Sequence, residues 1–241
     1  MKVILFGASG FIGAGSLEAL LNHPAVTEVV TVSRRPLTNA PASSKIRSVI
    51  LSDFFSYPED VVSQLATAEA CIWCVGTYSG DEKVEVDFPK NFHNAMTSSP
   101  SWSTRTKEFR FVLLGGTFTE PDQEKSLWWM QQARRVRGNA QNIAISWNDA
   151  KWKSTVVRAG GVLPASAKQN WWQCGAKMLL GDRFDILIEL PALSAVMVEL
   201  ALNSEQGKAE GGVVGNKESV TWGRYLLATK RMRAGDNSGG Q

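Results

Sequence analysis

The sequence has no hydrophobic run that approaches the roughly 20 residues needed to span a membrane. Its apolar start breaks at Gly7 and is too short for the core of a signal peptide. The formal net charge is only +3, and the basic residues are scattered along the chain, so the composition does not predict binding to nucleic acid. These absences favour a cytoplasmic protein with neither a membrane nor a nucleic acid as its partner.

Cysteine is also scarce, and the 3 cysteines are an odd number that fits a reducing compartment. Cys71 and Cys74 form a CxxC pair, but they lie in an apolar run typical of a β-strand. Residues three apart in a strand point to opposite faces of the sheet, so the two thiols should diverge. We therefore expect core packing here and no metal site.

The sequence does contain a regular alternation of short apolar runs and longer amphipathic stretches. This pattern is typical of βαβ units and predicts an α/β fold of Rossmann type with a doubly wound parallel sheet. The expected strands are 2–6, 28–33, 46–51, 70–75, 109–114, 154–158 and 211–215. The expected helices are 11–22, 125–147, 192–203 and 221–230. Residues 1–230 should form one domain and 231–241 a flexible tail.

A glycine-rich turn follows the first expected strand and opens the first expected helix. Gly7 permits a sharp turn, Gly10 lets the backbone approach a pyrophosphate, and Gly13 lets the helix pack closely on the strand. A helix N-terminus adds unpaired amides and a positive dipole, which favour a phosphate. The turn therefore predicts a dinucleotide site, and its expected contacts are Gly7, Ser9, Gly10, Phe11, Ile12 and Gly13.

The end of the second strand favours NADP(H) over NAD(H). NAD sites place an acid there to hold the ribose 2′-hydroxyl, whereas this strand ends with Arg34 and Arg35. A guanidinium is suited to a 2′-phosphate and can stack on adenine. Further contacts are expected after the third and fourth strands, from Asp53 and Phe54 at the adenine, and from Val75, Gly76 and Thr77 beside its ribose.

These motifs resemble the atypical short-chain dehydrogenase/reductase superfamily, and above all its NmrA-like and Tat-interacting-protein-like branch. The stretches that carry the resemblance are GASGFIG at 7–13, VSRRPL at 32–37, CVGT at 74–77, VVRAGGVLP at 156–164 and GVVGNKES at 212–219. The resemblance implies a sheet of about seven strands and a small C-terminal region, about 160–230, that covers a substrate. It also implies that Gly160 and Val162 lie near the nicotinamide.

The sequence departs from that superfamily where its catalytic residues are expected. Active members carry a Ser after the fifth strand and a Tyr-x-x-x-Lys on the next helix. Here Gly116 stands at the Ser position, and Trp129 and Ala133 stand at the positions of the dyad. None of the 3 tyrosines is followed by a lysine four residues later. The usual route of proton transfer is therefore absent.

Two hydroxyl groups remain as candidates for proton transfer. Tyr78 follows the fourth strand in a loop expected to overhang the cofactor, and Thr117 follows the fifth. A phenol can donate a proton if its pKa is lowered, although an aromatic residue can equally well line the pocket. His23 and His93 are expected on helices away from this edge of the sheet. An arginine such as Arg134 or Arg137 could hold a ribose by its charge but is a poor acid.

Tryptophan is abundant, with 9 residues. Five of them fall in segments expected to wall the substrate side, which predicts a pocket for an apolar or aromatic small molecule: Trp128, Trp129, Trp171, Trp172 and Trp222. Three functions remain open: an NADPH-dependent oxidoreductase, a non-redox isomerase or cyclase that reuses the pocket, and a regulatory protein that senses NADP(H). The long helix from Lys125 could serve a homodimer, or it could pack on the sheet.

Overall fold

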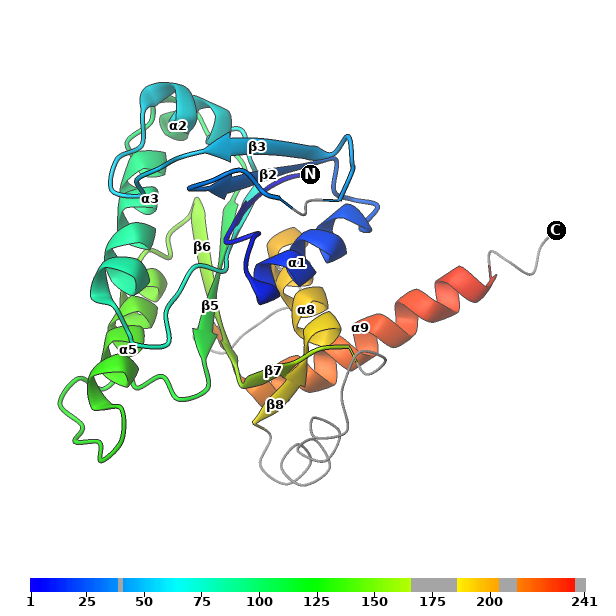
Figure 1. Ribbon diagram of the computed structural model, residues 1–241. Helices are drawn as coiled ribbons and strands as arrows, with labels where there is room; N and C mark the ends of the chain where they lie inside the picture. Colours follow the sequence, from blue (N-terminus) through cyan, green and yellow to red (C-terminus); the bar gives the residue numbers. More distant parts are fainter. Residues whose placement is uncertain (39–40, 166–185, 204–211, 237–241) are drawn as a thin grey trace.

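Seven parallel strands form the centre of the molecule, in the order β3-β2-β1-β4-β5-β6-β9 (Figure 1). The computed structural model describes residues 1–38, 41–165, 186–203 and 212–236. The strands are β1 (Lys2–Phe6), β2 (Glu28–Ser33), β3 (Ile46–Ile50), β4 (Ala70–Trp73), β5 (Phe109–Gly116), β6 (Trp152–Ala159) and β9 (Val213–Val214). The predicted Rossmann-type sheet is therefore confirmed, and the first two strands lie close to their predicted bounds.

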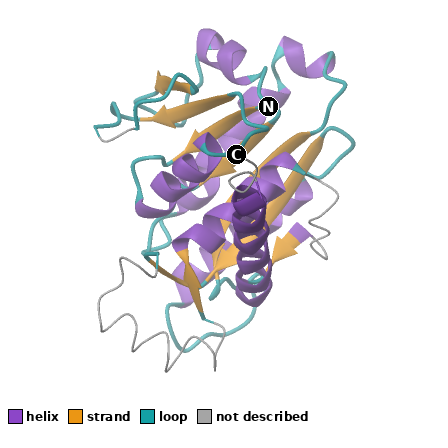
Figure 2. Cartoon of the chain, turned by 90° about the vertical axis from the view of Figure 1, so that its right-hand side faces the viewer, coloured by secondary structure: helices purple, strands orange, loops and turns teal. Residues whose placement is uncertain are grey.

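Helices cover both faces of the sheet (Figures 1 and 2). One face carries α1 (Phe11–Leu21), α8 (Leu190–Leu202) and α9 (Asn216–Asp236). The other carries α2 (Glu59–Leu65), η1 (Lys83–Asp87), α3 (Phe88–Thr97), α4 (Pro100–Ser103) and α5 (Gln131–Ser146). Parallel strands with helices on both faces are buried on both faces, which explains why the strands read as nearly continuous apolar runs.

Alternation along each strand divides the core into two clusters. In β1, Val3 and Leu5 pack under α1 and α8, whereas Ile4 and Phe6 pack on the opposite side. All four side chains are fully buried. Burial of one such side chain contributes about 1.5–3 kcal/mol relative to exposure. The hydrophobic effect therefore fixes the strand against both helical layers.

The cluster under α3 and α5 is largely aromatic. Phe6 stacks on Trp73 with ring centroids 4.2 Å apart, and Trp152 lies 4.7 Å from Phe109. Trp73 and Trp152 are both fully buried, and Trp102 and Trp147 pack against the same cluster. Four of the nine tryptophans therefore serve the core of the domain.

The CxxC pair is divided between the two clusters, as the strand pattern predicts. Cys71 belongs to the aromatic cluster, and Cys74 packs against the cluster under α1 and α8. Both thiols are free. Among the described residues, no group of three or more His, Cys, Asp or Glu side chains is placed to hold a metal ion.

The helix predicted for 125–147 begins only at Gln131, so its first six residues were wrongly assigned. Met130 has a left-handed backbone, with φ 46°, and such a residue cannot continue a right-handed helix. The amide of Leu127 instead donates to the Gln131 side chain at 3.0 Å. Ala133 and Ala140 of this helix are buried, whereas Met130 is 41% exposed.

The C-terminal region differs from the prediction in two respects. A small parallel sheet of β7 (Gly161–Leu163) and β8 (Leu187–Glu189) was not predicted. The closing helix α9 begins five residues earlier than expected and continues to Asp236, and its last turns project from the body (Figure 1). In the part of the chain that the structure describes, no helix combines the length and apolar character of a membrane span.

Candidate functional site

The turn between β1 and α1 requires glycine at two positions. Gly7 has φ +81°, a conformation that strains other residues. A Cβ atom on Gly7 would also stand 2.8 Å from the carbonyl carbon and oxygen of Cys74. A Cβ atom on Gly13 would stand 2.0 Å from the carbonyl oxygen of Gly7. The turn therefore wraps closely around the start of α1 and against the end of β4.

The N-terminus of α1 offers its amides to a ligand. Gly10 is the N-cap residue, and no side chain caps the helix. Its own amide donates to the Gly7 carbonyl at 2.9 Å. The first amides of a helix have no partner within the helix, and they add to the positive end of its dipole. Ser9 and Gly10 are exposed beside them, so an anion can reach this end of α1.

The turn also lies at the switch point of the sheet. β1 pairs with β2 on one side and with β4 on the other, so the chain order reverses between β1 and β4. Ligands of open α/β sheets bind in the crevice outside the carboxyl ends of the strands at this point. The sequence-predicted turn therefore lies where the topology places a ligand site.

The residues predicted to hold the adenosine half lie at the ends of β2 and β3. Arg34 and Arg35 follow β2, the direct neighbour of β1, and both are exposed. The Asp53 carboxylate accepts the amide of Phe55 at 2.9 Å, and Asp53 is exposed as well. Phe54 differs, because its side chain is 3% exposed and packs edge-on against Phe6. The Phe54 side chain therefore belongs to the core.

A buried carboxylate that the sequence analysis missed lies behind the end of β4. The Glu85 side chain is 10% exposed. Its Oε1 accepts hydrogen bonds from the amide of Thr77 at 2.7 Å and from the Thr77 hydroxyl at 3.3 Å. Burial raises the pKa of Glu85, and the hydrogen bonds from Thr77 and the charge of Arg137 partly oppose that rise.

Glu85 belongs to η1, a single π-helical turn, and such turns are frequent at functional sites. The signal in the sequence was its spacing. Glu85 lies four residues before Pro89 and seven before Phe92, both on the buried face of α3. A carboxylate on a buried helix face needs partners, and that observation alone could have singled it out.

Arg137 of α5 holds the loop after β4. Its Nη2 donates to the carbonyl oxygens of Thr77 and Tyr78, at 2.6 and 3.0 Å, and its Nε lies 3.8 Å from Glu85 Oε1. One turn earlier on α5, Ala133 packs under Gly80. A Cβ atom on Gly80 would stand 2.4 Å from the Ala133 Cα. The loop therefore covers Ala133, the position at which the resemblance places the lysine of the dyad.

The two hydroxyl candidates have different surroundings. Tyr78 is 94% exposed, so its ring lies on the surface. The Thr117 hydroxyl donates to the carbonyl oxygen of Arg158 at 3.4 Å. Beside it, a Cβ atom on Gly116 would have no described atom within 4 Å. The expected Ser position therefore opens onto free space in the described part of the chain.

Gly160 and Val162 follow β6 at the same edge. The amide of Gly160 donates to the side chain of Asn216 at 2.7 Å, and Val162 lies in β7, which pairs with β8. The ends of β1, β2, β4 and β6 therefore carry the predicted residues along one edge of the sheet.

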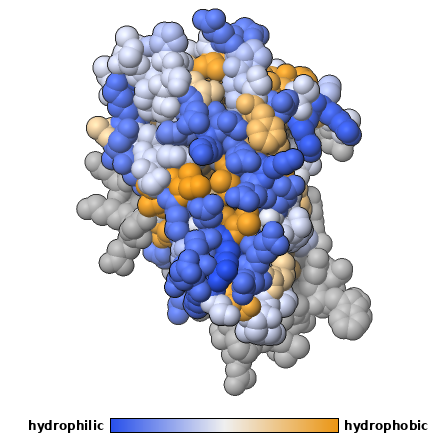
Figure 3. All heavy atoms as spheres, turned by 90° about the vertical axis from the view of Figure 1, so that its left-hand side faces the viewer, coloured by the Kyte–Doolittle hydropathy of each residue, from blue (hydrophilic) through white to orange (hydrophobic). Residues whose placement is uncertain are grey.

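Exposed aromatic side chains lie near this edge. Trp128 and Trp129 are 95% and 43% exposed. Phe118 meets Trp129 edge-on with centroids 5.5 Å apart, and the Phe118 carbonyl accepts from Arg134 on α5. Trp171 and Trp172 lie outside the described residues. On the face that Figure 3 shows, hydrophilic residues predominate and apolar ones form small patches.

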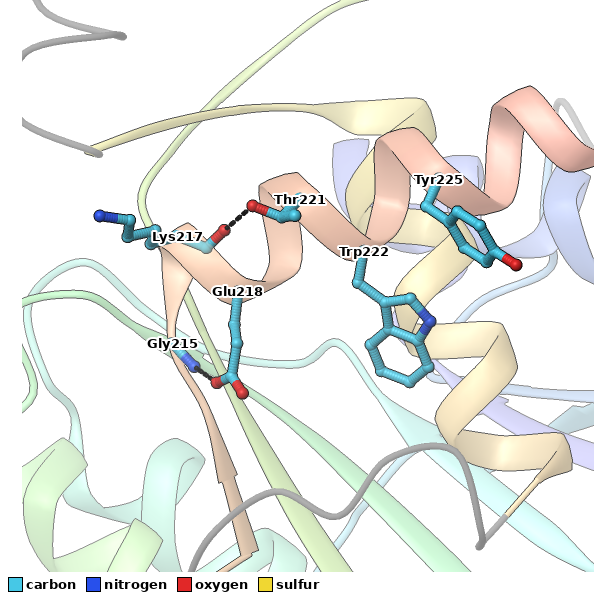
Figure 4. Close-up of a pocket in the computed structure, with 6 residues that line it drawn as sticks. All are labelled: Gly215, Lys217, Glu218, Thr221, Trp222 and Tyr225. Atoms are coloured by element: carbon cyan, nitrogen blue, oxygen red, sulfur yellow. Dashed lines mark hydrogen bonds between the residues drawn. The ribbon is translucent and has the colours of Figure 1, made fainter.

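Trp222 lies elsewhere, in an apolar groove of about 710 Å³ along α9 (Figure 4). Tyr225 and Thr221 line the same groove, and the Glu218 carboxylate accepts the amide of Gly215 at its end. The described lining residues all come from α9 and the residue before it. None of these lining residues belongs to the glycine-rich turn.

No protein-family model matches this chain. Among curated proteins, it is 33% identical over 76 residues to the leucinostatins biosynthesis cluster protein T of Purpureocillium lilacinum, which covers 32% of this chain and 28% of that protein. It is 24% identical over 108 residues to the mitochondrial protein FMP52 of Candida albicans. This match spans 43% of the present chain and 47% of FMP52. The matches thus span less than half the length of either relative.

Solved structures share the fold over most of the chain. The oxidoreductase ylbE from Lactococcus lactis aligns with a TM-score of 0.64 at 16% identity, over 92% of this chain and 95% of its own. The reductase domain of PhqB from Penicillium fellutanum aligns with a TM-score of 0.61 at 15% identity, over 89% of this chain and 66% of its own. Gre2 from Candida albicans, solved with NADPH, aligns with a TM-score of 0.58 at 15% identity, over 89% of this chain and 77% of its own. At these identities the likeness concerns the fold.

Proposed function

We propose, from the premise that this chain shares the fold of the oxidoreductase ylbE and of Gre2, that it is an atypical short-chain dehydrogenase/reductase that binds NADP(H) at residues 7–13. The observation that carries the proposal is the close packing of Gly13 on Gly7 together with the uncapped start of α1. A tight turn that bound no ligand would not require the first amides of α1 to be left without a capping side chain. The two together form a cradle that fits a pyrophosphate.

The choice of NADP(H) rests on Arg34 and Arg35. Both are exposed at the end of β2, where NAD sites carry an acid. A guanidinium there can form charge-assisted hydrogen bonds to a 2′-phosphate. Gre2, which shares the fold, was solved with NADPH, and this supports the choice.

The chain's own residues bind and orient the dinucleotide along the carboxyl edge of the sheet. When bound, the nicotinamide supplies hydride chemistry. The α1 amides hold the pyrophosphate, and the end of β4 supports the middle of the dinucleotide. The free space beside Gly116 receives the reacting end of the substrate. Positioning of this kind can supply a large part of a hydride-transfer rate.

The substrate that this edge favours is an apolar or aromatic small molecule. Phe118, Trp128 and Trp129 present aromatic surface near α5, and aromatic rings give a large contact area to a flat ligand. Tyr78 and Thr117 remain the candidates for a proton donor on the chain, with water as the alternative source of the proton.

A second candidate is a non-redox isomerase or cyclase. The observation that favours it is the contact of Gly80 with Ala133, because the loop after β4 covers the position where the superfamily carries the lysine of its dyad. Such an enzyme would use the pocket to bind and shape its substrate without net turnover of the cofactor. A sensor of NADP(H) would bind the nucleotide and turn over no substrate.

The test is a calorimetric titration with NADPH and with NADH, followed by incubation of the NADPH complex with carbonyl, enone and imine compounds. Each class should include aromatic members and small polar members as matched controls. We expect NADPH to bind at least about tenfold more tightly than NADH, and its oxidation to depend on an aromatic compound. Failure to bind NADPH would overturn the proposal. Binding without oxidation by any class would leave the non-redox enzyme or the sensor.

A further inference from the structure

The proposed function leaves Glu85 without a role. Its carboxylate lies behind the end of β4, where a Cβ atom on Gly76 would stand 3.3 Å from Oε2 and 3.4 Å from Oε1. Oε1 takes both hydrogen bonds from Thr77. The carboxylate therefore touches the backbone expected to run beside the cofactor.

The groups around Glu85 act on its pKa in opposite directions. Arg137 from α5 favours the charged form, but its Nη2 is also engaged by the carbonyls of Thr77 and Tyr78. On its own turn of helix, Lys83 and Asp87 carry opposite charges. Burial acts in the other direction and raises the pKa of Glu85. A change in burial or in nearby charge would therefore shift the protonation of this carboxyl group.

A bound dinucleotide would make that change. The end of β4 touches the glycine-rich turn, since a Cβ atom on Gly7 would meet Cys74 at 2.8 Å. A ligand that extends from this turn toward Gly116 must pass the exposed Gly76. It would exclude water from the carboxylate and bring negative phosphates toward it. Both effects disfavour a second negative charge.

We propose, as a consequence that rests on the proposed function, that Glu85 takes up one proton from the solvent, supplied by the acid form of the buffer, when NADP(H) occupies the site. The carboxylate becomes a neutral carboxylic acid, and no other bond changes. Thr77 can still donate its amide hydrogen bond to the carbonyl oxygen of the acid. The site would then hold a buried proton next to the nucleotide, in a protein that lacks the superfamily's usual donor.

The test measures proton uptake without any substrate. NADPH is titrated by calorimetry at about pH 6 to 7, in buffers of different ionisation enthalpy. The slope of the observed enthalpy against the buffer enthalpy gives the protons bound per nucleotide. We expect a wild-type uptake that exceeds that of Glu85→Gln by about 0.3 to 1 proton. The 2′-phosphate contributes equally to both proteins, and it cancels in the difference.

Glu120→Gln is the matched control. Glu120 is also a buried carboxylate after β5, but it pairs with Lys125 at 2.9 Å, and the hydrogen bond from Lys125 lowers its pKa. This variant should take up as many protons as the wild type. Equal uptake by wild type and Glu85→Gln would overturn the inference while NADPH binding kept the proposed function intact. Absence of NADPH binding to the wild type would instead refute the proposed function.

A second measurement needs no variant. In protein with ¹³C-labelled glutamate carboxyl groups, NMR should show one carboxyl that moves toward the protonated shift when NADPH is added at constant pH. If all glutamate carboxyls stay at their ionised shifts in the complex, the proton is not on Glu85 and the inference is wrong. This reading holds even if Glu85→Gln fails to fold.

Discussion

The carbonyl oxygen of Gly7 lies 2.0 Å from the point where a Cβ atom of Gly13 would stand. No adjustment of a flexible side chain can relieve such a contact, because the neighbour is backbone. The first turn of α1 can therefore pack this closely on the end of β1 only because residue 13 has no Cβ atom.

Gly13→Ala should destabilise the domain. Overpacking against backbone typically costs about 1–3 kcal/mol, which corresponds to a fall of about 2–12 °C in melting temperature at this chain length. Gly116→Ala is the control, because its Cβ atom would have no described neighbour within 4 Å. Thermal unfolding followed by circular dichroism measures both. Equal melting temperatures for the two variants would contradict the close packing.

Replacing Arg34 and Arg35 by alanine should weaken NADPH binding by about 10- to 100-fold, as expected for the loss of hydrogen bonds between charged groups. NADH has no 2′-phosphate, so its affinity should stay within about twofold of the wild type. Arg224→Ala removes an equally exposed arginine from α9 and should change neither affinity. Calorimetry provides the comparison, and an equal loss for both nucleotides would argue against a phosphate clamp.

Ala133→Lys restores a lysine at the position where the superfamily has one. It should destabilise the protein by about 2 kcal/mol or more, because Ala133 is 5% exposed and lies against Gly80. Gly116→Ser restores the missing serine at a position with no described atom within 4 Å of its Cβ atom, and it should cost less than about 0.5 kcal/mol. Urea unfolding of the two variants checks this contrast. A well-tolerated lysine would show that the loop after β4 moves away easily.

The thiols of Cys71 and Cys74 should resist alkylation in the folded protein. Burial raises the pKa of Cys71 and raises that of Cys74 to about 12, so the reactive thiolates are rare at about pH 8. In a Cys174→Ser background, iodoacetamide should label both residues only after unfolding, as measured by mass spectrometry. Rapid labelling of the native protein would refute their burial.

The same shifts predict a loss of stability at alkaline pH. An unfolded thiol loses its proton above about pH 8.5, whereas the folded thiols keep theirs, so the free energy of unfolding should fall as the pH rises. Cys71→Ala should make that decline shallower, as followed by urea unfolding at several pH values. A free energy of unfolding that rises as the pH increases above this value would contradict the prediction.

The sequence by itself determined the sheet and the glycine-rich turn that follows its first strand. Apolar runs of strand length separated by amphipathic stretches have few arrangements that bury both faces, and β1 and β2 follow directly from them. The spacing of Gly7, Gly10 and Gly13 is local, because the turn and the helix that it opens are adjacent in the chain. Local geometry of this kind can be read without the rest of the fold.

The tertiary structure decided what depends on contacts between distant segments. Because Met130 has a left-handed backbone, α5 begins only at Gln131, although the sequence before it has helical periodicity. Glu85 meets Thr77 and Arg137 only because η1 and α5 pack side by side. The sequence shows that a carboxylate is present but not whether water or protein surrounds it. The tertiary packing determines that environment and therefore the pKa of the group.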